Sequence, residues 1–342
     1  MPLTPSLREK LASAPGFGGA PLGNLYRAIP EDAATALVRH AYAAGARYFD
    51  TAPHYGHGRS EQRLGEGLRG QPRDDYLLST KVGRLLEART DAPRDQHGYI
   101  DTLPFVRVYD YTENGVRRSL EDSLRRLDVS RVDFVYVHDI DHATHGDAHA
   151  SHFADALDGG LPALAELKAR GAIGGYGLGV NDVAICLDVL QRLELDVILL
   201  AGRYTLADQT AVSELLPECA RRGVAIVLGG PFNSGILATG SQPSDGSAPY
   251  FNYAPAPQLI VDRVAAIERT CAEFSVPLPA AALQFPLSHP AVSCVLPGVR
   301  SKEEFDANLR WARHQIPVQF WSALRERRLI DPRAPVPGEQ GT

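Results

Sequence analysis

The chain has 342 residues, of which 44% are hydrophobic, and a formal net charge of −6 at pH 7. This length suits two domains or one α/β barrel, and the apolar share is enough for a large core. The sequence has no block of basic residues and no apolar run of the roughly 18 residues that span a membrane, so neither a nucleic-acid partner nor a membrane partner is expected. The N-terminus, MPLTPSLREK, lacks the apolar core of a signal peptide, and we expect a cytoplasmic location.

The four cysteines, Cys186, Cys219, Cys271 and Cys294, are scattered, and none belongs to a C-x-x-C pair. This spacing indicates neither a zinc ribbon nor a redox dithiol. It is typical of small buried hydrophobic residues in a reducing compartment.

Short apolar runs of β type alternate with segments of helical spacing along the chain. In the first such helix, Leu37 and Ala41 share one stripe, Pro30 suits the helix start and Gly45 its end. Continuous apolar strands are typical of a parallel sheet covered on both faces, and eight such β–α units predict a single (β/α)8 TIM barrel. The runs lie at 46–50, 76–82, 132–138, 174–180, 196–204, 224–230 and 292–299, with a weaker first strand in the glycine-rich stretch 14–23.

A doubly wound sheet is the alternative fold. Such sheets usually bind nucleotides through G-x-G-x-x-G, and residues 16–23 do not fit that pattern. Two connections, 83–110 and 238–257, are unusually long, and both follow strands, so we expect them as loops at the C-terminal, catalytic face of the barrel. Residues 1–330 are expected to form the barrel, and residues 331–342, DPRAPVPGEQGT, a flexible tail.

Four polar residues lie at or just after predicted strand ends. Asp50, Lys81 and His138 lie near the ends of the second, third and fourth strands, and Tyr55 follows the second. Active sites of (β/α)8 barrels form at these strand ends, so we expect the four to converge. A lysine inside an apolar strand needs a counter-charge, and Asp50 is the natural candidate. A structural ion pair with an unrelated tyrosine and histidine is the alternative.

The predicted cluster has the parts of a general acid/base site for interconversion of a carbonyl and an alcohol. The Lys81 ammonium group would lower the pKa of the Tyr55 phenol, whereas burial would raise it, so the cation must outweigh burial for Tyr55 to act near neutral pH. His138 could form a hydrogen bond with a substrate oxygen or with the phenol.

The stretch FDTAPHYGHGRSEQRLGEGL at 49–68 resembles the signature of the aldo-keto reductases, and STKVG at 79–83 and VHD at 137–139 resemble two further strands of that family. The resemblance covers residues 12 to 320. It implies that Asp50, Tyr55, Lys81 and His138 form the catalytic tetrad. It also implies hydride transfer between a nicotinamide cofactor and a substrate carbon, with Tyr55 handling the proton and without a metal.

The resemblance further implies where NAD or NADP binds. Asn181 matches a carboxamide-binding asparagine, but Val180 and Ala201 replace the usual serine and glutamine, and Gly229 stands where many relatives have a ring that stacks on nicotinamide. The segment 229–237 resembles the pyrophosphate loop. The segment 297–309 resembles the adenosine-binding segment, although an ordinary solvated helix start is the alternative. The implied positions are Gly18, Gly19, Ala20, Asp50, Asn181, Gly229, Pro231, Phe232, Asn233, Ser234, Gly235, Gly298, Arg300, Glu304 and Asn308.

Glu304 is the residue that bears on cofactor choice. A carboxylate repels a 2′-phosphate and can bind ribose hydroxyls, so the sequence favours NAD over NADP, although Arg300 lies close by.

The substrate is indicated by subgroup features. GFGGAPLGNLY at 16–26, AGRYT at 201–205 and GGPFNSGIL at 229–237 resemble a branch of the family. That branch contains bacterial aldose 1-dehydrogenases, acting on L-fucose, L-galactose or D-arabinose, and pyridoxal 4-dehydrogenases. Oxidation of an aldose at its anomeric carbon to a lactone is the expected reaction, with pyridoxal as the alternative. Candidate substrate contacts are Tyr26, His54, Tyr109 and Tyr111, and a monomer or small homo-oligomer is expected.

A histidine-rich stretch supports a rival class of protein. Residues 138–152 carry His138, His142, His145, His149 and His152, whose spacing could bind a divalent metal in a metal-dependent barrel hydrolase. The carboxylates and small polar residues around them are typical of a solvated loop. A non-catalytic barrel subunit is a third possibility, against which the intact tetrad argues.

Overall fold

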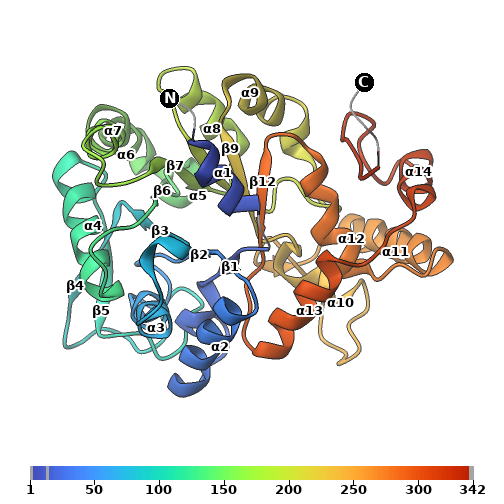
Figure 1. Cartoon of the computed structure of the whole chain (residues 1–342), viewed down its shortest axis with the longest axis horizontal. Helices are drawn as coiled ribbons and strands as arrows, with labels where there is room; N and C mark the ends of the chain where they lie inside the picture. The colour runs from blue at the N-terminus through green and yellow to red at the C-terminus, as the bar shows by residue number, and fades with distance from the viewer. Residues whose placement is uncertain (1–2, 13–14, 339–342) are drawn as a thin grey trace.

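The computed structural model describes residues 3–12 and 15–338. Eight strands form one parallel sheet in the order β1-β2-β3-β6-β7-β8-β9-β12, and Figure 1 shows helices surrounding it. Every predicted β run contains one of these strands, so the (β/α)8 barrel is confirmed and the doubly wound sheet is wrong. The strands are β1 (Phe17–Gly18), β2 (Tyr48–Asp50), β3 (Leu77–Val82), β6 (Phe134–His138), β7 (Gly175–Val180), β8 (Val197–Ala201), β9 (Ala225–Gly229) and β12 (Val292–Leu296).

The barrel closes between its first and last strands through backbone contacts. The Gly16 N–H donates to Val295 O at 2.9 Å, and the Gly18 N–H donates to Pro297 O at 3.0 Å. A Cβ on Gly18 would stand only 2.9 Å from Pro297 O, so this approach requires glycine. The short length of β1 explains its weak signal in the sequence.

The first long helix begins and ends close to the predicted proline and glycine. Helix α2 begins directly after Pro30, which is its N-cap rather than part of its first turn, and Gly45 follows its end with φ +106°. The longer helices are α2 (Glu31–Ala43), α3 (Arg59–Leu68), α4 (Glu113–Leu127), α7 (Leu161–Ala169), α8 (Val183–Leu190), α9 (Leu215–Arg222), α11 (Gln258–Glu273), α13 (Lys302–Ala312) and α14 (Val318–Glu326). The remaining helices are α1 (Pro5–Ala12), α5 (His142–His145), α6 (His149–Asp155), α10 (Ile236–Thr239) and α12 (Leu278–Gln284). Within the described ranges, no helix has both the length and the apolar character needed to cross a membrane.

Two apolar clusters build the core. The larger lies between the strands and the helices, and the smaller fills the barrel with side chains such as Tyr48, Phe134 and Tyr136. Leu3 and Leu11, from α1 and the residues before it, pack on the smaller cluster near the starts of the strands. The end of the barrel where the strands finish is therefore the one left for a site. All four cysteines are buried and free, which confirms that they are small buried residues.

The two long connections contain β hairpins that the sequence pattern does not reveal. In the first, β4 (Arg84–Ala88) pairs antiparallel with β5 (Phe105–Tyr109). In the second, β10 (Tyr250–Phe251) pairs with β11 (Ala254–Pro255). Each hairpin follows the end of a barrel strand, so side chains of the first hairpin reach the strand-end face.

The predicted flexible tail needs correction. Ala334 and Val336 are buried in the larger cluster, and the Asp331 N–H donates to Gln209 Oε1 at 2.6 Å. Apolar burial and backbone hydrogen bonding fix this segment against the barrel. Residues 339–342 lie outside the described residues.

Candidate active site

Asp50 and Lys81 form a buried ion pair at the ends of neighbouring strands. Lys81 Nζ lies 2.6 Å from Asp50 Oδ2 and donates to Thr51 O at 2.9 Å, while Ser79 Oγ donates to Asp50 Oδ1 at 2.6 Å. Burial raises the pKa of Asp50 and lowers the pKa of Lys81, and the attraction between the two charges opposes both shifts. Lys81 thus has the counter-charge that its place in an apolar strand requires.

Tyr55 lies in the irregular turn between β2 and α3, with Lys81 Nζ 4.8 Å from the centroid of its ring. The turn packs closely on residues 20–23, because a Cβ on Gly56 would stand 2.4 Å from Gly23 O. Burial raises the pKa of Tyr55 well above its usual value, and the Asp50 carboxylate raises it further. Burial therefore has a larger effect on the pKa of Tyr55 than the Lys81 charge, because Asp50 compensates that charge. Tyr55 keeps its proton at neutral pH in the protein without ligands.

His138 ends β6 and faces Tyr55, with the two ring centroids 6.1 Å apart. Burial lowers the pKa of His138 well below its usual value, and the nearby Arg84 and Lys81 lower it further, so the imidazole is neutral. Its Nδ1 is buried without a hydrogen-bond partner in the described part of the chain. A buried polar atom in this state is an open position for a hydrogen bond. Together, Tyr55 and His138 can exchange a proton with a bound oxygen and orient it.

Further polar side chains support the strand ends next to the tetrad, and the sequence pattern did not predict their contacts. Arg84, on β4, forms an ion pair with Asp139. Tyr111 donates to His138 O at 2.7 Å and is completely buried, so its prediction as a substrate contact is wrong: its hydroxyl supports the end of β6 instead. In the sequence, only the VHD motif at 137–139 drew attention to Asp139.

The other predicted substrate contacts differ in position. The His54 ring lies 6.5 Å from the Tyr55 ring and 6.1 Å from the His138 ring, so it borders the site. Tyr109 packs on the His145 ring at 4.5 Å, at the edge of the first hairpin. Tyr26 is 51% exposed, with a left-handed φ of +59°, and its N–H donates to Gly98 O at 2.8 Å.

The glycine-rich cofactor segments meet at the ends of β1, β9 and β12. Gly298 forms a parallel bridge with Gly18, and the Gly19 N–H donates to Asp50 O at 2.8 Å. Gly235 has nothing within 4 Å of the place a Cβ would take, so the main chain after β9 lies open beside it. The open backbone at Gly235 could accommodate the phosphates of a dinucleotide.

Several predicted cofactor residues have structural partners of their own. The Asn233 side chain donates to Gly202 O at 3.0 Å and bonds Thr205, so it holds the loop together. Glu304 Oε2 accepts from the Arg300 N–H at 2.7 Å, and the Ser301 hydroxyl accepts from the Glu304 N–H. This resembles a capping box, except that Glu304 bonds the residue before the N-cap. Of the predicted cofactor residues, Ser234, Gly298, Arg300 and Glu304 are exposed, Ala20, Asn181, Phe232 and Gly235 are partly buried, and Gly18, Gly19, Asp50, Gly229, Pro231, Asn233 and Asn308 are buried.

The histidine-rich stretch packs against aromatic rings. The His145 ring lies 4.6 Å from the His152 ring, and His145 Nε2 lies 2.8 Å from Asp139 O. Across residues 3–12 and 15–338, no three His, Cys, Asp or Glu side chains are grouped so that they could hold a metal ion.

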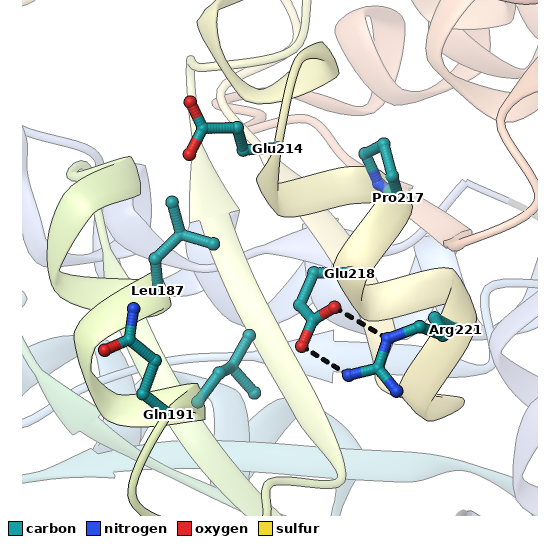
Figure 2. Close-up of a pocket in the computed structure, with 7 residues that line it drawn as sticks. Leu187, Gln191, Glu214, Pro217, Glu218 and Arg221 are labelled. Carbon is teal, nitrogen blue, oxygen red and sulfur yellow. Dashed lines mark hydrogen bonds and ion pairs between the residues drawn. The ribbon is translucent and has the colours of Figure 1, made fainter.

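A separate surface pocket of about 380 Å³ lies between α8 and α9. Figure 2 shows Leu187 and Gln191 on one side and the ion pair of Glu218 with Arg221 on the other. None of the predicted catalytic or cofactor residues lines this pocket, so it is not the candidate active site.

Known proteins share both the sequence and the fold. The sequence model of the Aldo/keto reductase family matches residues 16–328. The chain is 45% identical over 328 residues to a pyridoxal 4-dehydrogenase of Microbacterium luteolum, covering 93% of this chain and 94% of that protein. It is 39% identical over 323 residues to a D-threo-aldose 1-dehydrogenase of a Pseudomonas species, covering 92% and 94%. The solved structure of aldo-keto reductase AKR11C1 from Bacillus halodurans, in its holo form, superimposes with a TM-score of 0.70 at 25% identity, covering 96% and 95%.

A parallel barrel with a tyrosine, a histidine and a lysine–aspartate pair at its strand ends defines a class of oxidoreductase, and the chain belongs to the Aldo/keto reductase family. It is an NAD(P)-dependent dehydrogenase of that family. The alternatives of a metal-dependent hydrolase and a non-catalytic subunit are therefore wrong.

Proposed function

We propose that the enzyme oxidises a cyclic hemiacetal to a lactone, with an aldose of the L-fucose, L-galactose or D-arabinose type as substrate. The observation that carries this proposal is the placement of Tyr55 and His138, with rings 6.1 Å apart, beside the buried pair of Lys81 and Asp50. The similarity to a D-threo-aldose 1-dehydrogenase supports the sugar.

In this proposal each residue of the tetrad has a distinct task. Tyr55 takes the proton of the anomeric hydroxyl, and His138 holds the same oxygen through a hydrogen bond. Lys81 stabilises the phenolate that Tyr55 must provide, and Asp50 keeps Lys81 charged and in place. Asn181 and the segments 229–237 and 297–309 would hold the dinucleotide cofactor, which would supply the hydride acceptor for the anomeric carbon.

Pyridoxal is the second candidate substrate. The 45% identity to a pyridoxal 4-dehydrogenase exceeds the identity to the aldose enzyme, and a hemiacetal of pyridoxal presents the same group to Tyr55. We also propose NAD as the preferred cofactor, because Glu304 fixes a negative charge at the start of α13. A cytoplasmic monomer or small homo-oligomer completes the proposal.

The proposal is tested by absorbance at 340 nm, with NAD or NADP and each of L-fucose, L-galactose, D-arabinose and pyridoxal. Formation of reduced cofactor with an aldose supports the first candidate, and formation with pyridoxal alone supports the second. If the enzyme binds the dinucleotide but oxidises none of the four, the proposed substrates are wrong.

The rate of oxidation is expected to increase as the pH rises. Tyr55 must accept a proton, and its pKa is raised by burial, so the reactive phenolate fraction grows about tenfold per pH unit below that pKa. We expect kcat/KM for oxidation to rise from about pH 7 to about pH 9, whereas reduction, which uses the protonated phenol, stays nearly flat. Equal pH dependence in both directions would show that another group transfers the proton.

Chelation is expected to leave the rate unchanged. The proposed proton transfer uses side chains alone, and no group suited to a metal occurs among the residues with described positions. Dialysis against EDTA should therefore not change kcat, and restoration of a lost rate by zinc but not by buffer would contradict the proposal.

A further inference from the structure

Arg107 places an uncompensated positive charge at the mouth of the site. It lies on β5, where its Nη1 is 3.5 Å from His54 Nδ1 and its guanidinium carbon is 4.7 Å from the centroid of the Tyr109 ring. Among the residues whose structure is described, no carboxylate forms an ion pair with it. Burial lowers the pKa of Arg107, and the neighbouring Arg84 lowers it further.

Other buried or half-buried arginines in this structure have carboxylate or backbone carbonyl partners, as Arg47 and Arg263 do with carbonyl groups. Arg63 is paired with Glu31 at 2.9 Å, and Arg126 is paired with Glu61 at 2.5 Å. Asp139 forms its ion pair with Arg84 and attracts Arg107 only from a distance. Partial burial of a cation beside a second cation costs free energy, and an anionic ligand would reduce that cost.

The position of Arg107 points to the substrate as that group. His54 lies between Arg107 and the proposed catalytic pair, and its ring is 6.1 Å from that of His138. Burial lowers the pKa of His54 well below its usual value, as do Arg84 and Arg107, so the ring is neutral. Because Arg107 donates to Nδ1, the proton of His54 is on Nε2, where it can be donated to a ligand.

The aromatic side chains next to His54 could pack against a flat ring of the substrate. The Tyr99 ring stacks on the Tyr55 ring at 6.1 Å, and the His54 ring meets the Tyr99 ring edge-on at 5.3 Å. The hairpin that carries Arg107 follows β3, whereas the proposed phosphate segments follow β9 and β12, on the other side of the barrel. The phosphates of the cofactor are therefore not the counter-charge.

We infer that Arg107, together with His54, recognises an ionised oxygen on the substrate ring, so that the preferred substrate is an aromatic hemiacetal bearing a phenolate. This inference rests on the proposed reaction and favours its second candidate substrate, pyridoxal, over the aldoses. Pyridoxal carries an acidic ring hydroxyl that is ionised at neutral pH, whereas the aldoses are uncharged. A charge-assisted hydrogen bond to guanidinium distinguishes the two.

The test compares the binding of two products to enzyme saturated with reduced cofactor, by calorimetry. The ligands are 4-pyridoxolactone and its O-methyl ether, which cannot ionise. The wild type should bind the free phenol about tenfold or more tightly than the ether. Arg107→Met should reduce that preference to about twofold or less, and Arg107→Lys should keep part of it.

Controls separate this role from loss of fold and from failure of the proposed function. Arg89→Met removes the same charge from an exposed site next to the hairpin, where Arg89 pairs with Asp91, and should leave the preference intact. Unchanged binding of the reduced cofactor shows that each variant is folded. The inference is overturned if the wild type binds neither ligand, or does not prefer the phenol, or if Arg107→Met retains the preference.

Turnover by the wild type is measured separately at 340 nm. Oxidation of aldoses but not of pyridoxal would overturn the role of Arg107 and keep the proposed function. Absence of oxidation with every hemiacetal, alongside an Arg107-dependent preference for the phenol, would reject the proposed reaction and keep the recognition site.

Discussion

Replacing Tyr55 with phenylalanine should lower kcat for oxidation by about 10²- to 10⁴-fold, the range by which a positioned acid or base accelerates a reaction. The substitution removes only the hydroxyl, so the ring still packs over Lys81 and against the Tyr99 ring. Steady-state rates at saturating cofactor measure the effect, and binding of the reduced cofactor should be unchanged.

Tyr99→Phe is the matched control for this substitution. Tyr99 is also buried and lies against Tyr55, but it is not placed beside Lys81. Its variant should lose less than about tenfold in kcat, the effect of a modest change in packing. A Tyr55→Phe enzyme that turns over at a near-normal rate would show that Tyr55 does not transfer the proton.

Replacing Lys81 with methionine should damage both activity and stability. Asp50 would be left as a buried carboxylate without its partner, which typically costs about 3–5 kcal/mol in the free energy of unfolding. The phenolate of Tyr55 would also lose its nearest cation, so the rise of oxidation with pH should move to higher pH. Urea denaturation and the pH profile of kcat/KM measure the two effects.

A double variant separates the two roles of Lys81. Adding Asp50→Asn removes the unpaired charge, so Lys81→Met with Asp50→Asn should recover most of the lost stability without recovering activity. Activity near that of the wild type in the double variant would mean that Lys81 acts only by holding Asp50. Full stability of the single variant would mean that water reaches Asp50.

The barrel and the convergence of the tetrad could be predicted because their signals are local. Apolar runs mark the strands, and parallel strands bring their ends to one face whatever lies between them, so Asp50, Lys81 and His138 could be placed together from the sequence. The glycine pattern was enough to place β1 but not to show that it is two residues long.

The parts that escaped prediction depend on contacts between distant segments. Arg107 in FVRVY reads as an ordinary strand residue, and only the hairpin brings it to His54. Tyr111 lies close in sequence to Tyr109, yet its ring points inward to the carbonyl of His138. The pKa of Tyr55 depends on how fully Asp50 compensates Lys81, which spacing along the chain cannot reveal.

The closure between β1 and β12 has a consequence for how the protein folds. Its hydrogen bonds join Gly18 to Pro297, so they form only after nearly the whole chain has been made and arranged. Contacts of such long range carry a large entropic cost before they gain energy, and they slow folding. Residues of both β1 and the segment after β12 are proposed to bind the dinucleotide, so bound cofactor would favour the closed barrel by mass action. Without the cofactor, the barrel would open first between β1 and β12.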